Sequence, residues 1–535
     1  FFFSSRRRHT RFRNVTGVQT CALPISDEPA LHHRPSRERT ETLSFAALAE
    51  RSERIAARLA ERLPAGARLL LQGSPSPTLA ALYLAAARAG IVLVPLDLRM
   101  SGDTIGRIAG ASGAAALLLA PGALIDPATE PTLRDLPRLE LSALAAEGPT
   151  GDALAARPLP TPSTPYELVF TSGTTGNPKG VVLTHANLIA SLERMRATVP
   201  DRRHRLVSIL PLSHVMEQVG GLFYVLATGS ATEYLGSLRP DVFLGAMREG
   251  RVTAVICVPQ VLELVAAGID REVAKRGRAT LFARLRRIAH YLPIALRRRL
   301  FSRIHATLGG ELAYIVSAAA YLPPTLQTYY ESLGVTVLQG YGTTECGLVT
   351  TTFPGRAPAG SVGYPLPPTE LRLGAGGEIE VRGPSVSSGY FENPTATAEA
   401  FTADGWYRTG DAGRLGADGR LILVGRTRTM FVLPNGMNVF PEDIESLLVD
   451  EGLTEPVAFE AAPGRIEVAV IAGRALRDRS ADEASGLDAA LKRANRRLGD
   501  HQRVHGWRPY PDDDFPRTHT LKVKRSELTA RLMTR

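Results

Sequence analysis

The residues best suited to chemistry lie in a loop rich in glycine and hydroxyl side chains. It runs from Thr171 to Gly180, reads TSGTTGNPKG, and follows an apolar strand expected at Glu167–Phe170. Such a loop offers backbone N–H groups and hydroxyls to a polyanion, and Lys179 adds a mobile positive charge. Its Gly-x-x-Gly-x-x-Lys spacing differs from that of a Walker loop. An ordinary polar turn would not need this composition. The predicted phosphate contacts are Thr171, Ser172, Gly173, Thr174, Thr175, Gly176 and Lys179.

The segments around this loop alternate between short apolar strands and helices. Helices are expected at Thr42–Leu63 and Leu79–Ala89. Further strands are expected at Arg68–Gln72, Ile91–Leu96, Leu206–Leu210, Ala254–Val258, Ala313–Val316 and Val335–Leu338. This rhythm is typical of parallel sheets covered by helices, so the expected fold class is α/β, with packed α/β subdomains in a large N-terminal domain.

The texture changes in the last third of the chain. Short strands and turns over about 361–425 predict a β-rich subdomain within an N-terminal domain spanning 27–425. Residues 426–428 are interpreted as a hinge, and 429–535 as a smaller, mobile α/β lid.

Composition limits the class of protein. A chain of 535 residues with 44% hydrophobic and 22% charged residues is typical of an ordinary globular protein of several domains. No uncharged apolar run reaches the ~20 residues that a membrane-spanning helix needs. The three cysteines, Cys21, Cys257 and Cys346, have neither disulfide-framework nor metal-ligand spacing, which predicts a cytoplasmic location.

The first 26 residues carry five arginines and no acid, without helical or strand periodicity. They resemble translated sequencing adapter, so we expect 1–26 to be an artefactual segment that replaces the true N-terminus. A natural disordered basic arm is the alternative.

The net charge of +10 is concentrated in two places. Residues 271–303 hold eleven basic residues and one acid, and residues 1–26 hold five basic residues. The remainder has 47 basic and 52 acidic residues, so overall basicity does not predict a nucleic-acid partner.

The glycine-rich loop closely resembles the phosphate loop of the adenylate-forming superfamily, which includes acyl-CoA synthetases, adenylation domains of peptide synthetases and beetle luciferases. Four further segments resemble the family's signatures, in family order between about Leu43 and Arg525. They are Pro211–Val219 at the acid pocket, Gln339–Cys346 for adenine and magnesium, Gly405–Ala412 for ribose, and Pro516–Ser526 with a catalytic lysine. His214 is the residue that the first of these segments brings to the acid pocket.

The residue types in the Gln339–Cys346 segment suit the roles that the resemblance implies. Tyr341 offers a flat ring for adenine, while Gly340 and Gly342 let the backbone approach the nucleotide. Glu345 is a hard oxygen ligand for Mg²⁺, and the Thr344 hydroxyl would contact the α-phosphate. Alone, Thr-Thr-Glu is more often a helix cap and Tyr341 could be a core tyrosine.

The later signatures supply residues that are expected to bind the ribose and to stabilise negative charge on the phosphates. Asp411 would accept hydrogen bonds from the ribose hydroxyls, supported by Arg426. Attack of a carboxylate on the α-phosphate of ATP builds negative charge, which Mg²⁺, Lys179 and Lys522 would stabilise. Leu521 stands where the family usually has glycine, so Lys524 remains a competing candidate. The resemblance also implies a pivot at Arg428, where the family usually has Asp or Lys.

The basic segment 271–303 resembles the basic linker of long-chain fatty acyl-CoA synthetases. Leucines, isoleucines and a phenylalanine recur among its arginines at near-helical spacing, as in helices that lie on anionic membranes. One membrane-facing surface is expected to contain Arg284, Arg286, Arg287, Arg297, Arg298 and Arg299. The equally weighted alternative is a solvated helical face or a helical hairpin packed on the large domain.

Together these features predict an enzyme that uses ATP and Mg²⁺ to convert a long-chain fatty acid into an acyl-adenylate and then into a coenzyme A thioester. A fatty acyl-AMP ligase or an acyl-acyl-carrier-protein synthetase is the nearest alternative, with an acyl carrier protein as partner. A non-enzymatic membrane- or nucleic-acid-binding protein that uses 271–303 is the alternative of another class. The expected location is cytoplasmic, extending to a peripheral position on the inner face of the membrane.

Overall fold

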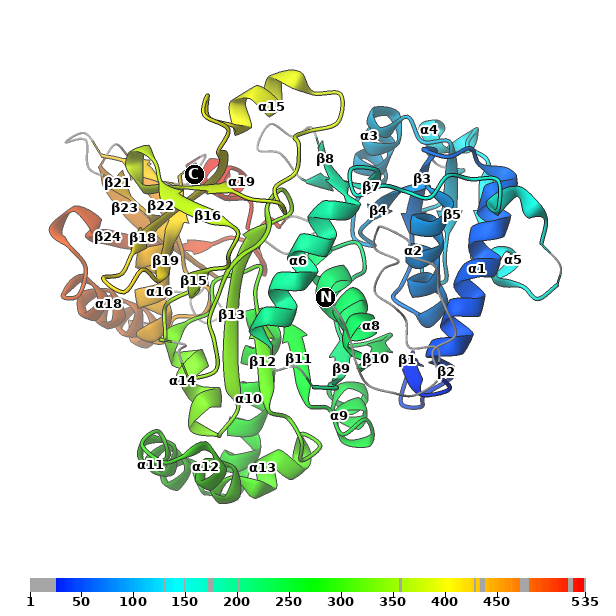
Figure 1. Ribbon diagram of the computed structural model, residues 1–535. Helices are drawn as coiled ribbons and strands as arrows, with labels where there is room; N and C mark the ends of the chain where they lie inside the picture. Colours follow the sequence, from blue (N-terminus) through cyan, green and yellow to red (C-terminus); the bar gives the residue numbers. More distant parts are fainter. Residues whose placement is uncertain are drawn as a thin grey trace.

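The computed structural model describes residues 26–128, 130–148, 150–171, 178–199, 202–355, 358–427, 430–433, 438–462, 464–471, 481–517 and 523–533. Two helix-covered sheets lie side by side in the larger part of the molecule, and smaller sheets follow toward the C-terminus (Figure 1). This mixed architecture confirms the α/β class.

A six-stranded sheet carries the glycine-rich loop. Its order is β6 (Arg138–Glu140), β5 (Ala116–Leu119), β3 (Arg68–Gln72), β4 (Val92–Leu96), β7 (Pro165–Thr171) and β8 (Lys179–Thr184). All neighbours pair in parallel except the β7–β8 hairpin. Both faces are covered, so β4 is buried along its whole length, as a parallel sheet requires.

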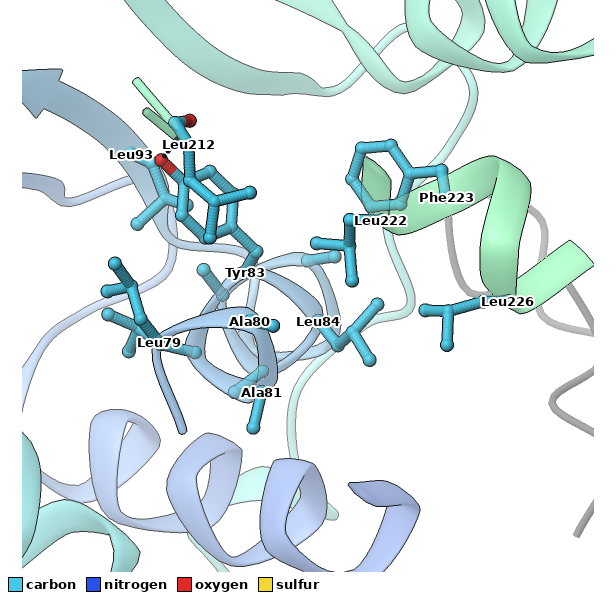
Figure 2. Packing of buried hydrophobic residues seen from close by; sticks show 14 of the residues in the cluster. Leu79, Ala80, Ala81, Tyr83, Leu84, Leu93, Leu212, Leu222, Phe223 and Leu226 are labelled. Carbon is cyan, nitrogen blue, oxygen red and sulfur yellow. Dashed lines mark hydrogen bonds between the residues drawn. The ribbon is translucent and has the colours of Figure 1, made fainter. Parts of the chain in front are cut away.

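Helix α2 (Pro77–Ala89) packs against elements of both sheets. Eleven of its thirteen residues are buried, and its small side chains allow neighbours to approach from all sides. Ser76 caps its start and Gly90, at φ 66°, ends it. Figure 2 shows Leu84 beside Leu222 and Leu226 of the second sheet's helical layer, so the two sheets share one hydrophobic core.

The second sheet has nine strands. Its order is β15 (Tyr364–Pro365), β14 (Gly347–Thr351), β13 (Thr336–Thr343), β12 (Tyr314–Ser317), β11 (Ala254–Cys257), β9 (Arg205–Ser208), β10 (Ala231–Leu235), β1 (Pro29–Arg34) and β2 (Glu41–Ser44). The central strands are parallel. The edge strands β2 and β15, and β14 next to β15, are antiparallel to their neighbours. The turn between β13 and β14 carries Thr344 and Glu345. The pairing of these two strands near one edge of the sheet therefore sets the position of both residues.

Helices cover both large sheets. They are α1 (Phe45–Arg62), α3 (Gly102–Ser112), α4 (Pro131–Arg134), α5 (Leu141–Ala145), α6 (His185–Thr198), α7 (Val215–Glu217), α8 (Tyr224–Thr228), α9 (Pro240–Glu249), α10 (Pro259–Lys275), α11 (Ala279–Ala289), α12 (Ile294–Leu300), α13 (Ser302–Thr307) and α14 (Pro324–Ser332). A π-helical turn at Gln218–Phe223 joins α7 to α8. The helix predicted over Thr42–Leu63 begins later than expected, because Glu41–Ser44 pairs with β1 and Ser44 caps α1 at the Ala47 N–H.

The remaining sheets are smaller. An antiparallel sheet contains β16 (Glu370–Leu373), β17 (Glu378–Arg382), β18 (Tyr407–Leu415) and β19 (Leu421–Arg426), with α15 (Pro394–Ala400) inserted before β18. The C-terminal elements are β20 (Phe431–Val432), β21 (Asn438–Val439), α16 (Pro441–Asp450), β22 (Val457–Ala462), β23 (Arg465–Ile471), α18 (Ala481–Asn495), β24 (Val504–Tyr510) and α19 (Arg525–Met533). Among the described residues, no helix is both long and apolar enough to cross a membrane.

Candidate active site

The β7–β8 hairpin brings the two ends of the glycine-rich loop together. Thr171 and Lys179 are paired residues of the hairpin, and the Thr171 hydroxyl lies 3.5 Å from the Lys179 carbonyl oxygen. A Cβ at Gly180 would lie 2.9 Å from the Phe170 ring, so glycine is needed for this close approach. The predicted contacts Ser172, Gly173, Thr174, Thr175 and Gly176 lie outside the described residues and stay predictions.

Tyr390, which the sequence analysis missed, connects the loop lysine to the predicted magnesium ligand. The Lys179 Nζ lies 5.3 Å from the centre of the Tyr390 ring, and the Tyr390 hydroxyl donates to Glu345 Oε1 at 3.1 Å. Tyr390 also pairs with Val181 of β8 through a backbone bridge. Two groups far apart in sequence therefore meet at one side chain. The one available signal was the Gly-Tyr pair at 389–390, which repeats the Gly-Tyr pair at 340–341.

The environment of Glu345 suits a magnesium ion that is held mainly by substrate. Glu345 is half-buried, and its Oε2 has no hydrogen bond among the described residues. In that same part of the chain, no group of three or more His, Cys, Asp or Glu could hold a metal ion. Mg²⁺ commonly binds one or two carboxylates together with substrate phosphates and water. A single carboxylate beside a phosphate loop fits that pattern.

Replacing Tyr390 should therefore reduce adenylate formation, and the reduction should be larger when both of its contacts are removed than when one is. Tyr390→Phe keeps the ring beneath Lys179 but removes the hydrogen bond to Glu345, so we expect adenylate formation to fall about 10-fold. Tyr390→Leu removes both contacts and should cost about 100-fold. Calorimetry of ATP binding with and without Mg²⁺ measures the role directly, because losing the Glu345 contact should weaken mainly the Mg²⁺-dependent part. Equal losses in the two variants would contradict the assignment of two separate contacts.

The predicted adenine residue, on β13 of the nine-stranded sheet, meets the predicted ribose residues, on β18 and β19 of the four-stranded sheet. The Tyr341 hydroxyl donates to Asp411 Oδ2 at 2.8 Å, and Arg426 Nε lies 3.2 Å from Asp411 Oδ1. Asp411 and Arg426 are paired residues of β18 and β19. Tyr341 is 6% exposed, so its ring belongs largely to the core while its hydroxyl orients Asp411. Its stacking on adenine stays a prediction.

Glycine is required where β13 turns into β14. A Cβ at Gly342 would lie 1.8 Å from the Gly347 carbonyl oxygen, and Gly347 itself has φ +60°. The half-buried Thr344 lies within this turn, and Gly340 pairs with Thr351 of β14. The turn thereby holds Glu345 close to Tyr390.

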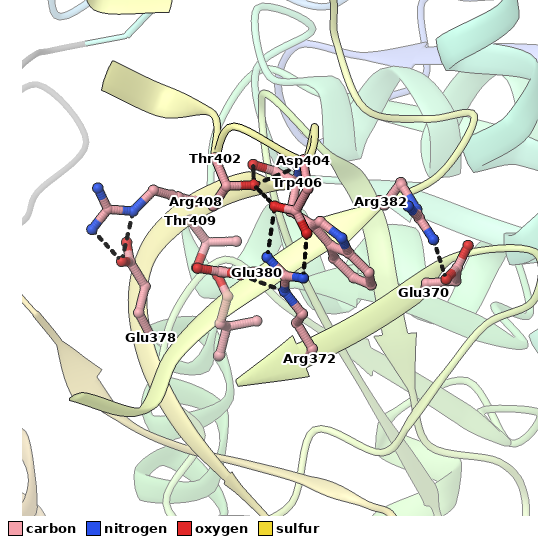
Figure 3. A network of polar contacts seen from close by, with 11 residues as sticks. Glu370, Arg372, Glu378, Glu380, Arg382, Thr402, Asp404, Trp406, Arg408 and Thr409 are labelled. Carbon is pink, nitrogen blue, oxygen red and sulfur yellow. Dashed lines mark hydrogen bonds and ion pairs between the residues drawn. The ribbon is translucent and has the colours of Figure 1, made fainter. Parts of the chain in front are cut away.

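A network of polar contacts fixes the start of β18, the strand that carries the predicted ribose residue Asp411. Arg372 contacts Glu380 at 2.6 Å and Asp404 at 2.7 Å, and its guanidinium carbon lies 4.5 Å from the centre of the Trp406 ring (Figure 3). These contacts tie the turn before β18 to β16 and β17. Asp411 lies further along β18, so the contacts that fix the start of this strand also help to fix the position of Asp411.

His214 is oriented by an aspartate that the sequence analysis did not select. His214 Nε2 lies 3.3 Å from Asp97 Oδ2, and Asp97 is 1% exposed. Burial alone would raise the pKa of Asp97, but hydrogen bonds from His214 and Arg99 hold that pKa well below its ordinary value. Asp97 directly follows β4. A lone acid at the carboxyl end of a buried parallel strand was the signal available in the sequence.

Buried polar groups fix the backbone around His214. Gln218 Nε2 donates to Glu167 Oε2 at 3.0 Å and to the Leu212 carbonyl oxygen at 2.9 Å. The Tyr83 hydroxyl donates to the same carbonyl at 2.7 Å. Burial raises the pKa of Glu167 to about 8, and burial also raises the pKa of the neighbouring Glu217 to about 8.

These two acids predict a specific pH dependence of stability. Above their ordinary pKa of 4.5 the unfolded chain releases both protons, whereas the folded chain keeps them until about pH 8. Stability should therefore fall as pH rises through this window, by about 1.4 kcal/mol per pH unit for each group. Glu167→Gln and Glu217→Gln should each reduce that slope in denaturant unfolding. Glu50→Gln, on the exposed face of α1, is the control; slopes unchanged in the two buried variants would refute the assignment.

The remaining predicted residues belong to the hinge and the C-terminal part of the chain. Lys522 and the pivot Arg428 are outside the described residues, so their roles stay predictions. Arg517 and Val523 form an antiparallel bridge, so the chain on either side of Lys522 comes together. The competing candidate Lys524 is paired with Glu527 at 3.4 Å.

Two relatives of this chain are named long-chain-fatty-acid–CoA ligases. The Mycobacterium bovis long-chain-fatty-acid–CoA ligase FadD15 is 32% identical over 412 residues, covering 68% of this chain and 67% of that protein. Human long-chain-fatty-acid–CoA ligase 1 is 34% identical over 337 residues, covering 57% of this chain. The match spans 47% of that human protein, so it extends over about half of its length.

Solved structures share the fold at low sequence identity. The o-succinylbenzoate CoA synthetase of Bacillus subtilis, in complex with its acyl-adenylate intermediate, superposes with a TM-score of 0.76 at 21% identity and covers 96% of this chain and 98% of its own. ATP-bound MatB from Rhodopseudomonas palustris gives 0.75 at 22% identity, with 97% and 99% covered. The model of the family described as AMP-binding enzyme matches residues 20–391. Since the match extends over more than half of the chain, this protein belongs to the AMP-binding enzyme family.

Proposed function

We propose that this enzyme couples a long-chain fatty acid to coenzyme A through an acyl-adenylate. The observation that carries the proposal is the contact series from Lys179 through Tyr390 to Glu345, which unites a phosphate-binding loop with a carboxylate suited to Mg²⁺. Activation of an acid by ATP requires such a site. The choice of a long-chain acid is supported by relatives named long-chain-fatty-acid–CoA ligases at 32% and 34% identity.

In the first half-reaction the acid's carboxylate attacks the α-phosphate of ATP and pyrophosphate leaves. Asp411 and Arg426 hold the ribose, and the loop holds the phosphates near Lys179. Mg²⁺ at Glu345 would supply positive charge beside the phosphates. Lys522 and Lys179 stabilise the negative charge that develops in the transition state. His214, fixed by Asp97, lies on the segment that borders the acid.

The second half-reaction transfers the acyl group to a thiol. A hinge at 426–428 with Arg428 as pivot would let the C-terminal elements rotate between the two half-reactions, and closure would exclude water from the adenylate. Coenzyme A is the proposed acceptor. Transfer to an acyl carrier protein, or release of the adenylate, is the alternative.

A panel of acids tests the proposal. The purified chain is supplied with ATP, Mg²⁺ and either a long-chain fatty acid, acetate, malonate or o-succinylbenzoate, and pyrophosphate and thioester are measured separately. We expect pyrophosphate with the long-chain acid alone and thioester only when coenzyme A is added. Higher kcat/KM for a short dicarboxylic acid would refute the proposed substrate class. Pyrophosphate without thioester would refute the acceptor but preserve adenylation.

A further inference from the structure

A short segment, residues 384–391, contacts both the strand that follows the glycine-rich loop and the turn that carries Glu345. At its end, the Phe391 N–H donates to the Gly180 carbonyl oxygen at 2.7 Å. This contact joins the segment to β8, the strand that begins at Lys179. Residues 384–391 are called the cradle segment below.

The middle of the cradle segment holds the backbone of the turn. The Ser387 N–H donates to the Glu345 carbonyl oxygen at 2.7 Å. The Ser385 hydroxyl donates to the Cys346 carbonyl oxygen at 2.5 Å. Tyr390, near the end of the same segment, donates to the Glu345 carboxylate. The cradle segment therefore contacts Glu345 at both its main chain and its side chain.

Helix α6 packs on the same turn. It follows β8 directly and lies against β14 (Figure 1). A Cβ at Gly347, the first residue of β14, would lie 2.2 Å from the Ser191 Oγ of α6 and 3.2 Å from the Ser385 Cβ. Both α6 and the cradle segment thus approach the end of the turn too closely for it to shift without moving one of them.

Asn187, in the first turn of α6, links the helix to the cradle segment. Its Nδ2 donates to the carbonyl oxygens of Pro384 and Val386, each at 3.0 Å. Its Oδ1 accepts from the Thr184 N–H at 2.9 Å, which completes the capping box of α6. The side chain is 8% exposed, and both of its N–H groups are used. The two carbonyl groups flank Ser385, so Asn187 fixes the part of the segment that holds the turn.

We propose that Asn187 is a positioning residue for the predicted magnesium ligand Glu345. It acts through the cradle segment, whose Ser385 and Ser387 hold the main chain of the turn. Completing the capping box needs only the oxygen of the side chain, as the glutamate or glutamine common at this helix position shows. The two donated hydrogen bonds serve the cradle segment instead.

The chemistry of Mg²⁺ makes such positioning important. Mg²⁺ demands near-ideal octahedral geometry, so a carboxylate that shares the ion with phosphates must stay at a fixed position beside the phosphate loop. Replacing residues that orient a metal ligand commonly weakens metal binding by about 10- to 100-fold. The proposal rests on the adenylation proposed above, with Glu345 as the magnesium ligand.

Asn187→Asp separates the two uses of this side chain. Aspartate keeps the oxygen that completes the capping box but cannot donate to the two carbonyl groups. Calorimetry measures ATP binding to the full chain with and without Mg²⁺, in the absence of any acid. We expect the gain in ATP affinity on adding Mg²⁺ to shrink about 10-fold, while the affinity without Mg²⁺ changes by less than about 2-fold. Pyrophosphate release should need about 10-fold more Mg²⁺ to reach half its maximal rate.

Two further variants complete the test. Ser385→Ala removes one hydrogen bond to the turn and should change the Mg²⁺ dependence in the same direction by about 3-fold. Asn393→Asp is the matched control, because the Asn393 side chain caps α15 by accepting from the Ala396 N–H at 3.0 Å, a contact that aspartate keeps. It should leave the Mg²⁺ dependence unchanged.

The unmodified chain separates failure of this proposal from failure of the proposed function. If Mg²⁺ has no effect on its ATP binding, both the magnesium role of Glu345 and the proposal are overturned. A normal Mg²⁺ effect that persists unchanged in Asn187→Asp and Ser385→Ala would overturn the proposal alone. Equal losses of ATP binding with and without Mg²⁺, together with a lower melting temperature, would also overturn it by showing a purely structural role. If Asn187→Asp prevents folding, Ser385→Ala decides.

Discussion

Lys522→Ala should lower adenylate formation by about 1000-fold while leaving thioester formation from supplied acyl-adenylate within a few-fold of normal. The first half-reaction builds negative charge on the phosphoryl oxygens and the leaving pyrophosphate, whereas the second breaks a bond to AMP without pyrophosphate present. Pyrophosphate release from ATP and acid measures the first step. Thioester formation from synthetic acyl-adenylate and coenzyme A measures the second.

Lys524→Ala is the control for this experiment, because Lys524 lies two residues later and is paired with Glu527. It should change neither half-reaction by more than a few-fold. A large loss of adenylation in Lys524→Ala together with normal adenylation in Lys522→Ala would transfer the catalytic role to Lys524. Equal losses in both half-reactions would show that Lys522 acts through folding or lid closure instead.

Asp411→Ala should raise the KM for ATP roughly 100-fold and change kcat much less. The carboxylate would accept hydrogen bonds from the ribose hydroxyls, and hydrogen bonds to a charged group contribute about 1.5–3 kcal/mol each. Because the ribose contact is similar in the ground and transition states, its loss should appear mainly in binding. Steady-state kinetics and calorimetry with AMP measure this split.

Asp418→Ala provides a closely matched control on the same sheet. Asp418 accepts hydrogen bonds from the Tyr364 hydroxyl at 2.9 Å and from Arg420 at 3.0 Å. Asp411 similarly accepts a hydrogen bond from Tyr341 and forms an ion pair with Arg426. It lies in the exposed turn between β18 and β19 instead of beside Tyr341. Both variants lose a Tyr–Asp–Arg contact, so only a role in nucleotide binding predicts a raised KM for Asp411→Ala alone.

The sequence by itself determined the α/β class and was enough to predict candidate site residues. The strand at Arg68–Gln72 was predicted with its observed bounds because an apolar run between polar residues reports burial directly. The loop at 171–180 could be predicted to bind phosphate because its composition is local. Glu345 and Asp411 could be predicted as site residues because each lies in a short segment with several features in order.

Only the tertiary structure decided which side chains act together. Tyr390 and Asp97 lie in segments without chemical signatures, and they matter because sheet order brings them to Glu345 and His214. Composition likewise could not separate the six arginines expected on one membrane-facing surface of segment 271–303. Arg286, Arg297 and Arg298 are half-buried, whereas Arg284, Arg287 and Arg299 are exposed. That separation depends on which face of α11 covers the core and where carbonyl groups lie unpaired, and both follow from contacts between residues distant in sequence.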